Sequence, residues 1–198
     1  METFLVTSPA NRIFQRCVEA PMLRRLGGRT PGARALEIGC GSGYGTKLII
    51  DQFGAATVDA VDLDPAMVTR ARHRLRRYND QVRVEQGSAD DLQAALGAAD
   101  ASYDAVFDFG IIHHVINWRD AVAEVSRVLR PRGRFYYLEV SAAALARPSY
   151  RRLLDHPTKD RFTAGQFLAE LTAHGLEPAD SWRTYIGSDY LAGVAQRS

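Results

Sequence analysis

The sequence predicts an α/β fold built around one doubly wound sheet of seven strands, mostly parallel, with an antiparallel hairpin at its C-terminal end. Three observations lead to this prediction. Five short strand-like segments alternate with stretches of helical periodicity between residues 33 and 140. A glycine-rich loop follows the first of these segments. Two further strand-like segments, joined by a short turn, follow the last predicted helix.

The chain has 198 residues, 46% of them hydrophobic and 24% charged, which is the balance of one globular domain. No apolar run approaches the ~20 residues of a membrane span, and the N-terminus lacks the pattern of a secretory signal, so we expect a cytoplasmic protein. Two cysteines, Cys17 and Cys40, are too few for a disulfide framework. The formal net charge of +2 implies no polyanionic partner such as nucleic acid.

The first predicted element is a helical segment over residues 9–28. Its apolar residues recur close to the 3.6-residue period of a helix, and Pro21 lies among them, so we expect two short helices or one kinked helix. One apolar face of this segment has no partner within the strand–helix alternation, and we expect it to pack over the ligand crevice as a lid. That face consists of Ile13, Phe14, Cys17 and Val18.

The elements that follow are bounded by capping and turn signals. Pro65 is a favourable first helical residue behind Asp64, Pro131–Gly133 makes a turn, and Gly175 is a typical helix end. The predicted strands are 33–38, 57–63, 81–86, 103–107 and 134–140. The predicted helices run from the glycine loop to about 53, then over 65–78, 91–96, 118–129 and 164–174. The closing hairpin pairs 176–186 with 190–196 around Gly187–Asp189.

In open sheets of this kind, ligands bind outside the carboxyl ends of the strands, where the strand order reverses. This rule places four segment ends around one crevice. They are the glycine loop 39–43, Asp62, Ser88 and Phe109.

The glycine loop Gly39–Gly43 has glycine at every second position and opens a helix. Glycine permits positive φ and close approach of a ligand to the backbone, and the helix start favours a carboxylate or phosphate. A dinucleotide fingerprint would need glycine at position 44, which is Tyr44, and Glu37 would bring negative charge near a pyrophosphate. An NAD-dependent oxidoreductase is therefore disfavoured, and a tight turn without a ligand is the structural alternative.

The second strand ends in Val61–Asp64. A carboxylate at this position, about 20 residues beyond the glycine loop, can accept both hydroxyls of a ribose, and we assign this role to Asp62. Leu63 beside it could pack on an adenine face. Asp64 is assigned to the helix N-cap because Pro65 follows it. The alternative for Asp62 is a solvated loop carboxylate.

A series of motifs follows one another between about residues 33 and 140. They are Leu36–Gly43, Val61–Met67, Gly87–Leu92, Tyr103–Val106, Ile112–Val115 and Arg127–Gly133. In these motifs the chain resembles the class I S-adenosylmethionine-dependent methyltransferases, of the small-molecule type. The resemblance implies a Rossmann-like sheet, S-adenosylmethionine as cofactor with S-adenosylhomocysteine as product, and no metal.

The resemblance also implies the cofactor contacts. The glycine loop would hold the methionine part and Asp62 the ribose, and the segment 88–90 would meet the adenine. The full set of expected contacts is Glu37, Gly39, Cys40, Gly41, Gly43, Asp62, Leu63, Ser88, Ala89, Asp90 and Phe109. Ser88 departs from an acid common in the family, which shifts adenine-amine recognition to Asp90 or the Ala89 backbone. Arg132 replaces a glycine common after Pro131, and we expect only that turn to change.

His113 and His114 follow the fourth strand and are the only histidines near the expected crevice. Histidine titrates near neutrality, so either one could take a proton from the methyl acceptor, and we prefer His113. The structural alternative is that one histidine packs against the sheet and the other orders the loop.

The densest charge run is arginine-rich and lies between residues 70 and 77. The apolar stripe of the same predicted helix faces inward, so these arginines are expected on its solvated faces, and an RNA-binding ridge is the alternative. The run consists of Arg70, Arg72, Arg74, Arg76 and Arg77.

The predicted function is transfer of a methyl group from S-adenosylmethionine to oxygen or nitrogen of a small molecule. The alternatives are a cofactor-binding partner subunit of a methyltransferase complex and an RNA or protein methyltransferase. We expect one domain over 1–198, with a helical lid (1–30), a cofactor-binding core (33–140), and helices with the closing hairpin (141–198). We expect no nucleic-acid partner and no membrane span.

Overall fold

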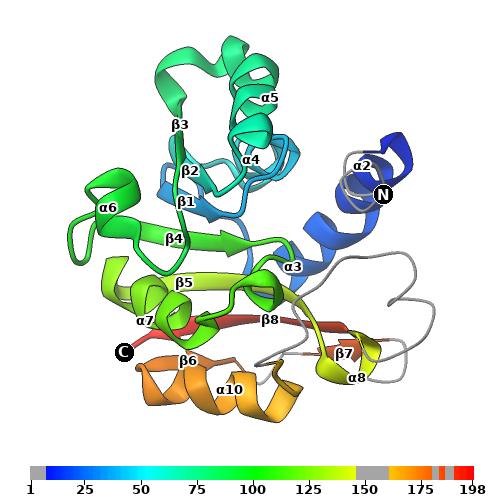
Figure 1. The fold of residues 1–198 in the computed structure, drawn as a ribbon, viewed down its shortest axis with the longest axis vertical. Coiled ribbons are helices and arrows are strands. Elements are labelled where there is room, and N and C mark those ends of the chain that lie inside the picture. The colour runs from blue at the N-terminus through cyan, green and yellow to red at the C-terminus, as the bar shows by residue number, and fades with distance from the viewer. Residues whose placement is uncertain (1–7, 146–160, 180–182, 186–189) are drawn as a thin grey trace.

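A central mixed sheet organises the computed structural model, which describes residues 8–145, 161–179, 183–185 and 190–198. The strands are hydrogen-bonded in the order β3-β2-β1-β4-β5-β8-β6, and β7 also pairs with β8 (Figure 1). Their bounds are β1 (Arg34–Ile38), β2 (Thr57–Asp62), β3 (Val82–Gln86), β4 (Tyr103–Asp108), β5 (Leu129–Val140), β6 (Leu176–Pro178), β7 (Arg183–Tyr185) and β8 (Tyr190–Arg197).

The first five strands are parallel, and β8 is antiparallel to β5. β6 pairs with residues 195–197 of β8, and β7 pairs with residues 190–192, so these two short strands share one edge of β8. The sheet therefore has seven strand positions, which confirms the predicted fold class. The predicted strand 176–186 is present as two segments, and the predicted turn at 187–189 lies outside the described residues.

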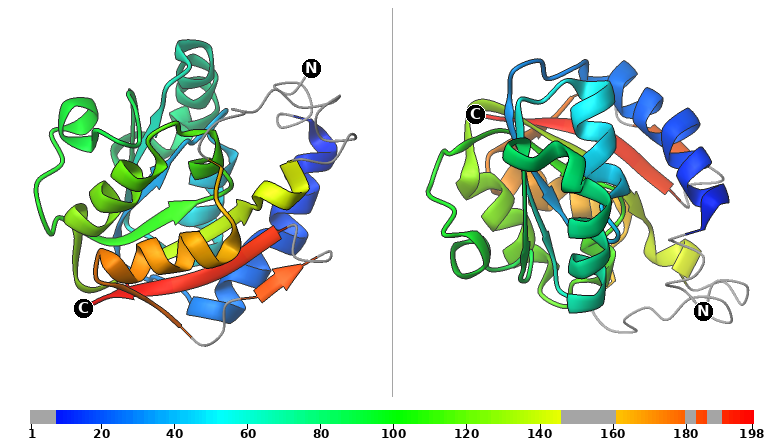
Figure 2. Two further views of the ribbon diagram at one scale, coloured as in Figure 1. Left: turned by 60° about the horizontal axis from the view of Figure 1, so that its bottom comes forward. Right: turned by 90° about the horizontal axis from the view of Figure 1, so that it is seen from above.

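Helices cover both faces of the sheet (Figure 2). Those before β3 are α2 (Pro9–Phe14), η1 (Gln15–Glu19), α3 (Ala20–Gly27), α4 (Tyr44–Leu48), η2 (Ile49–Phe53), α5 (Pro65–Leu75) and η3 (Arg76–Gln81). Those after β3 are α6 (Leu92–Leu96), η4 (Ile112–His114), α7 (Trp118–Val128), α8 (Ala142–Leu145) and α10 (Ala164–Ala173). Here η denotes a π turn in η1 and η2 and a 3₁₀ turn in η3 and η4.

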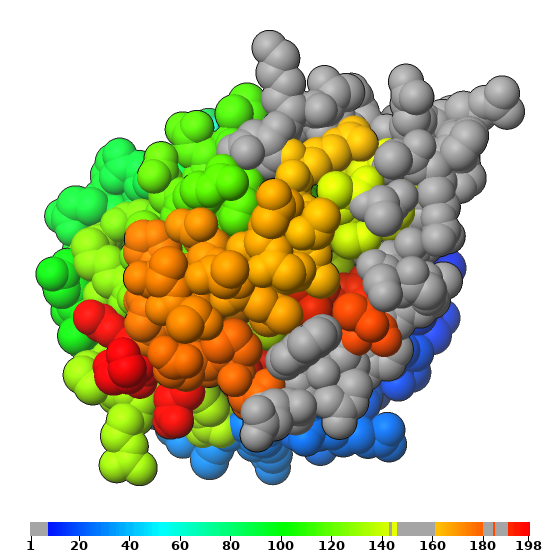
Figure 3. Space-filling model, turned by 90° about the horizontal axis from the view of Figure 1, so that it is seen from below, coloured from blue at the N-terminus to red at the C-terminus, as the bar shows by residue number. Residues whose placement is uncertain are grey.

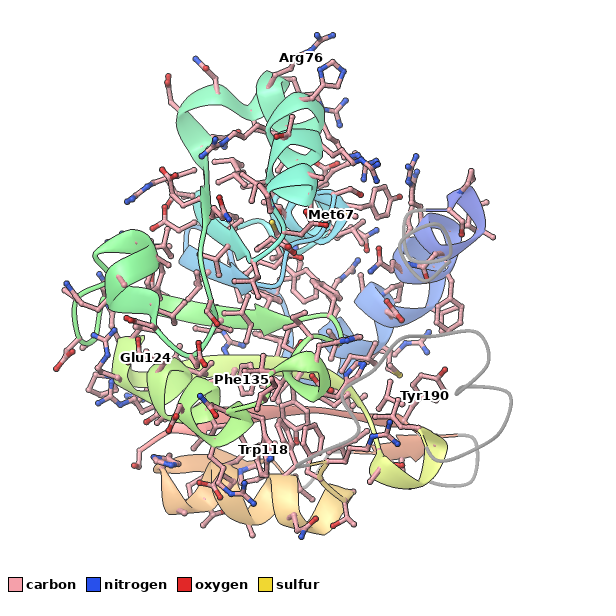
Figure 4. All side chains as sticks on the ribbon, viewed as in Figure 1. Met67, Arg76, Trp118, Glu124, Phe135 and Tyr190 are labelled. Carbon is pink, nitrogen blue, oxygen red and sulfur yellow. The ribbon has the colours of Figure 1, made fainter. Side chains whose placement is uncertain are left out.

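The two faces of the core follow the two-residue alternation of the strands. In β5, Phe135 and Tyr137 pack with α7 and α10, whereas Tyr136 between them packs with α3 and η2. Trp118 of α7 reaches the same layer as Phe135 (Figure 4), and its ring centroid lies 4.9 Å from that of Phe162. Figure 3 shows α10 lying across this face beside the C-terminal residues.

The N-terminal elements α2, η1 and α3 follow one another without a break, with the π turn η1 just before Pro21. This arrangement is the interrupted helix that the sequence predicts. α3 is anchored to the sheet through buried Leu23, but Ile13, Phe14 and Val18 are exposed. The apolar face thus points to solvent instead of lying over the crevice, because a helical period identifies a face and not the direction in which it points. Within the described residues, no helix has the length and apolar character needed to cross a membrane.

Candidate active site

The loop after β1 turns sharply because its glycines take conformations that other residues avoid. Gly39 has a φ of +65°, and a Cβ atom at this position would lie 2.1 Å from Ile111. Gly41 has a φ of +51°, and a Cβ atom there would have no neighbour within 4 Å. The backbone at Gly39 is therefore tightly enclosed, whereas that at Gly41 has an open side that a ligand can approach.

Asp62, at the end of β2, is fixed across this loop. Its Oδ2 accepts a hydrogen bond from the backbone amide of Gly41 at 2.7 Å, and its Oδ1 accepts one from the amide of Asp64 at 2.9 Å. Burial raises the pKa of Asp62 above its ordinary value. Asp64 accepts a hydrogen bond from the amide of Ala66 at 2.8 Å and caps α5, as the sequence predicts. The Asp62 carboxylate is thus oriented by the backbone and not simply solvated.

Glu37 of β1 lies beneath the start of α4. Its side chain is buried and accepts a hydrogen bond from the Thr46 hydroxyl. A Cβ atom on Gly45 would lie 2.0 Å from Glu37 Oε1, so only glycine leaves room for this carboxyl. Burial raises the pKa of Glu37 to about 8, and the negative charge of Asp62 acts in the same direction. Glu37 is therefore protonated at neutral pH in the folded protein.

These groups border a cavity of about 320 Å³ at the carboxyl ends of the central strands. Of the residues predicted to contact the cofactor, six line it: Glu37, Gly39, Cys40, Gly41, Asp62 and Phe109. His114, one of the two base candidates, lines it as well. The remaining lining residues are Arg12, Gln15, Ser42, Tyr44, Gly45, Asp64, Met67, Gly110 and Ile111.

The other predicted contacts lie around this cavity without lining it. Gly43 begins α4 in the left-handed conformation, packed against α5. Leu63 is 70% exposed next to Asp62. The amide of Gly87 donates to the carbonyl of Asp62 at 3.0 Å, which holds the segment Ser88–Asp90 near the end of β2. Within this segment Ala89 is buried and packs in the core with α6.

The two histidines differ in their surroundings. His113 is held by Glu139 of β5, with 2.6 Å between Nδ1 and Oε2, and burial lowers the pKa of His113 to about 3. The carboxyls of Glu139 and Asp108 lie together, and burial raises the pKa of both. His113 is therefore neutral, and its Nδ1 shares a hydrogen bond with the Glu139 carboxyl. His114 packs beside it, with 4.2 Å between the ring centroids, and borders the cavity.

Arg12 and Gln15 are site residues that the sequence analysis missed. They lie three positions apart, on the side of the N-terminal helical segment that continues into buried Glu19 and Leu23. This polar spacing was a signal that could have identified them. The exposed apolar residues of the segment mark only its opposite face.

The cavity of about 320 Å³ fits an adenosyl cofactor, and we refer to it as the cofactor cavity. A carboxylate oriented at the end of β2, a glycine loop with an open side and the strand order of the sheet are the features of such a site. The fold and this site define a class I S-adenosylmethionine-dependent methyltransferase. The comparison with known proteins agrees: the chain belongs to the methyltransferase domain family, which matches residues 36–137.

Two curated relatives come from Mycolicibacterium smegmatis. A probable S-adenosylmethionine-dependent methyltransferase is 40% identical over 112 residues, covering 57% of this chain and 40% of the relative. A fatty-acid O-methyltransferase is 35% identical over 133 residues, covering 64% of this chain and 44% of the relative. The chain thus spans less than half the length of either relative.

A solved structure shares the fold over nearly the whole chain. It belongs to a Haloferax volcanii complex between the Trm112 methyltransferase activator and a methyltransferase. The alignment has a TM-score of 0.76 and covers 98% of this chain and 93% of that chain. Sequence identity is 18%, so this likeness concerns the fold alone.

Proposed function

We propose that this domain transfers a methyl group from S-adenosylmethionine to an oxygen or nitrogen atom of a small molecule. The observation that carries the proposal is the cavity in which Asp62 and the glycine loop face His114 and Arg12. Its volume of about 320 Å³ falls in the range of small-molecule sites. The relative named as a fatty-acid O-methyltransferase supports an oxygen of a small molecule as acceptor.

The residues of this chain would hold the cofactor as follows. Asp62 accepts the ribose hydroxyls, and the backbone of residues 39–43 approaches the methionine part over buried Glu37. Leu63 offers an apolar surface for the adenine, and the segment Ser88–Asp90 offers polar contacts to it. The chemistry that S-adenosylmethionine supplies when bound is a methyl group activated on a sulfonium.

The protein's remaining task is to align the acceptor and exclude water. We assign the acceptor side to His113 and His114. His114 borders the cavity, and we assign to it the removal of a proton from a hydroxyl acceptor. His113, which is held by Glu139, packs against the His114 ring and orients it. The helical segment Pro9–Gly27 acts as a lid through the side that carries Arg12 and Gln15.

Calorimetric titration of the purified chain tests the cofactor assignment. S-adenosylhomocysteine should bind and NADH should not, and the reverse result would overturn the proposal. Incubation with methyl-labelled S-adenosylmethionine and a metabolite extract should then give a labelled small molecule. Label that appears only after a second methyltransferase-like chain is added would show a partner subunit instead of a complete enzyme.

A further inference from the structure

A second cavity, of about 660 Å³, opens between α2 and α5 beside the cofactor cavity. Among the described residues, it is lined by Arg12, Ser42, Thr69, Arg70, His73 and Arg74. Three of these side chains are guanidiniums, one is an imidazole, and none is a carboxylate. We refer to it as the cationic cavity.

Three basic side chains of α5 lie together because of their helical spacing. Arg70, His73 and Arg74 stand at positions i, i+3 and i+4, so they share one face of the helix. Arg74 donates to the Ser42 hydroxyl at 2.9 Å, and its guanidinium lies 5.8 Å from the centre of the Tyr44 ring. These contacts hold one guanidinium against the glycine loop.

The guanidiniums of Arg12 and Arg74 both line this cavity. The pKa of Arg74 is lowered first by its partial burial and then by the positive charge of Arg12. Like charges held together at a cavity wall favour an anion between them, because the anion relieves their repulsion and accepts charge-assisted hydrogen bonds. The arrangement is therefore suited to a phosphate or carboxylate group.

The rest of the arginine run does not form a continuous ridge with these residues. Arg72 donates to the Val84 carbonyl and pairs with Glu85 at 2.9 Å, and Arg77 donates to the Tyr78 hydroxyl at 2.8 Å. Arg76 lies at the opposite end of α5 from Met67, which lines the cofactor cavity (Figure 4). A long nucleic-acid backbone would need a continuous positive track, whereas this pocket suits one compact anionic group.

We propose that the cationic cavity binds an anionic group, phosphate or carboxylate, of the methyl acceptor. Arg12 and Ser42 line both cavities, so a molecule anchored here extends directly toward the cofactor cavity. The inference rests on the proposed function and narrows it, since the acceptors are then anionic small molecules.

The test uses inorganic pyrophosphate as the probe, titrated calorimetrically into the chain saturated with S-adenosylhomocysteine. Arg70→Glu and Arg76→Glu are a matched pair, because Arg70 in α5 and Arg76 at the start of η3 are both exposed and each change alters the net charge equally. Arg70→Glu should weaken pyrophosphate binding about tenfold or more, and Arg76→Glu should change it by less than about twofold. Equal weakening by both variants, or no binding by the parent, would overturn the inference.

Two further measurements separate this inference from its rivals. Arg70→Glu should keep the parent's affinity for S-adenosylhomocysteine, and a parallel loss would assign the cavity to the cofactor instead. A single-stranded RNA that binds more tightly than pyrophosphate and is weakened by Arg76→Glu would indicate a nucleic-acid surface. In the labelling experiment, methylated products should elute with the anionic fraction on ion exchange. Products found only in the neutral or cationic fraction would refute the inference while leaving the methyltransferase function intact.

Discussion

The backbone amide of Gly41 donates a hydrogen bond to Oδ2 of Asp62 at 2.7 Å, which joins the loop after β1 to the end of β2. The glycine loop and the end of β2, which both line the cofactor cavity, are therefore joined by a hydrogen bond before any ligand binds. The same carboxylate is the group we assign to the ribose. A change at Asp62 should consequently affect both ligand affinity and the stability of the loop.

Asp62→Ala should weaken S-adenosylhomocysteine binding by roughly ten- to a hundredfold, because charge-assisted hydrogen bonds to the ribose are lost. It should also lower the free energy of unfolding by about 1–2 kcal/mol, because the amides of Gly41 and Asp64 lose their acceptor. Calorimetric titration and chemical denaturation measure the two effects. Parent-like affinity in this variant would contradict the ribose assignment.

Asp64→Ala is the matched change two residues away. It removes the N-cap of α5 and should cost about 1 kcal/mol of stability, while S-adenosylhomocysteine affinity stays close to that of the parent. The same two measurements apply. If affinity falls here and not in Asp62→Ala, the two aspartates have exchanged roles.

Glu37 should make stability depend on pH. In the unfolded chain its pKa is near 4.5, and in the folded protein burial raises it to about 8, so the folded state binds more protons between these values. The contribution of Glu37 is fully present below about pH 4.5 and is lost as the pH rises toward 8. Glu37→Gln keeps the side chain neutral and should remove this fall. The difference between the unfolding free energies of parent and variant, measured across the window, should change by at most about 1.4 kcal/mol per pH unit. A constant difference would mean that Glu37 titrates normally.

Substitutions of His113 and His114 should have different effects on kcat. If the acceptor is a hydroxyl, His114→Ala should lower kcat about 10²- to 10⁴-fold with little change in cofactor affinity. His113→Ala should also lower kcat, and His113→Asn should restore part of the rate because an amide can still form a hydrogen bond with Glu139. Unchanged rates in both alanine variants would instead indicate an amine acceptor that binds as its free base.

Arg132→Gly should stabilise the protein. Arg132 has a φ of +65°, in the left-handed region that favours glycine. The relief of this conformation is worth about 1–2 kcal/mol, and part of it is offset by the greater freedom of glycine in the unfolded chain. A net gain of up to about 1 kcal/mol is expected in denaturation experiments. A loss of stability would mean that the arginine side chain contributes more than its backbone conformation costs.

The core elements could be predicted from the sequence because their signals are local. β1, β2 and β4 are short segments in which most of the apolar residues are buried, and Asp64 with Pro65 fixes the start of α5. The division of the predicted strand 176–186 into β6 and β7 could not be predicted, since each short strand is defined by its own pairing with β8. The two short strands follow from tertiary pairing and not from local propensity.

The cofactor side of the site could likewise be predicted, since Gly41 and Asp62 belong to motifs with fixed spacing. The acceptor side of the site could not be predicted from the sequence. Which of two adjacent histidines borders the cavity depends on the buried carboxyl of Glu139, which is 26 positions from His113. Arg12 comes from a helix whose orientation is fixed by packing of α3 on the sheet.

The strand order leaves β3 and β6 at the two ends of the hydrogen-bonded order, where they can meet strands of neighbouring molecules. An unpaired sheet edge can recruit a strand from another chain and start aggregation. On the β3 edge, Arg72 donates to the Val84 carbonyl from both Nε and Nη2, at 3.0 and 2.8 Å, so this acceptor is already engaged. On the β6 edge, the last residue is Pro178, which has no amide hydrogen to offer. Among the described residues, β3 and β6 therefore each lack one backbone group that an added strand would use, which makes these two strands weaker templates for strand addition.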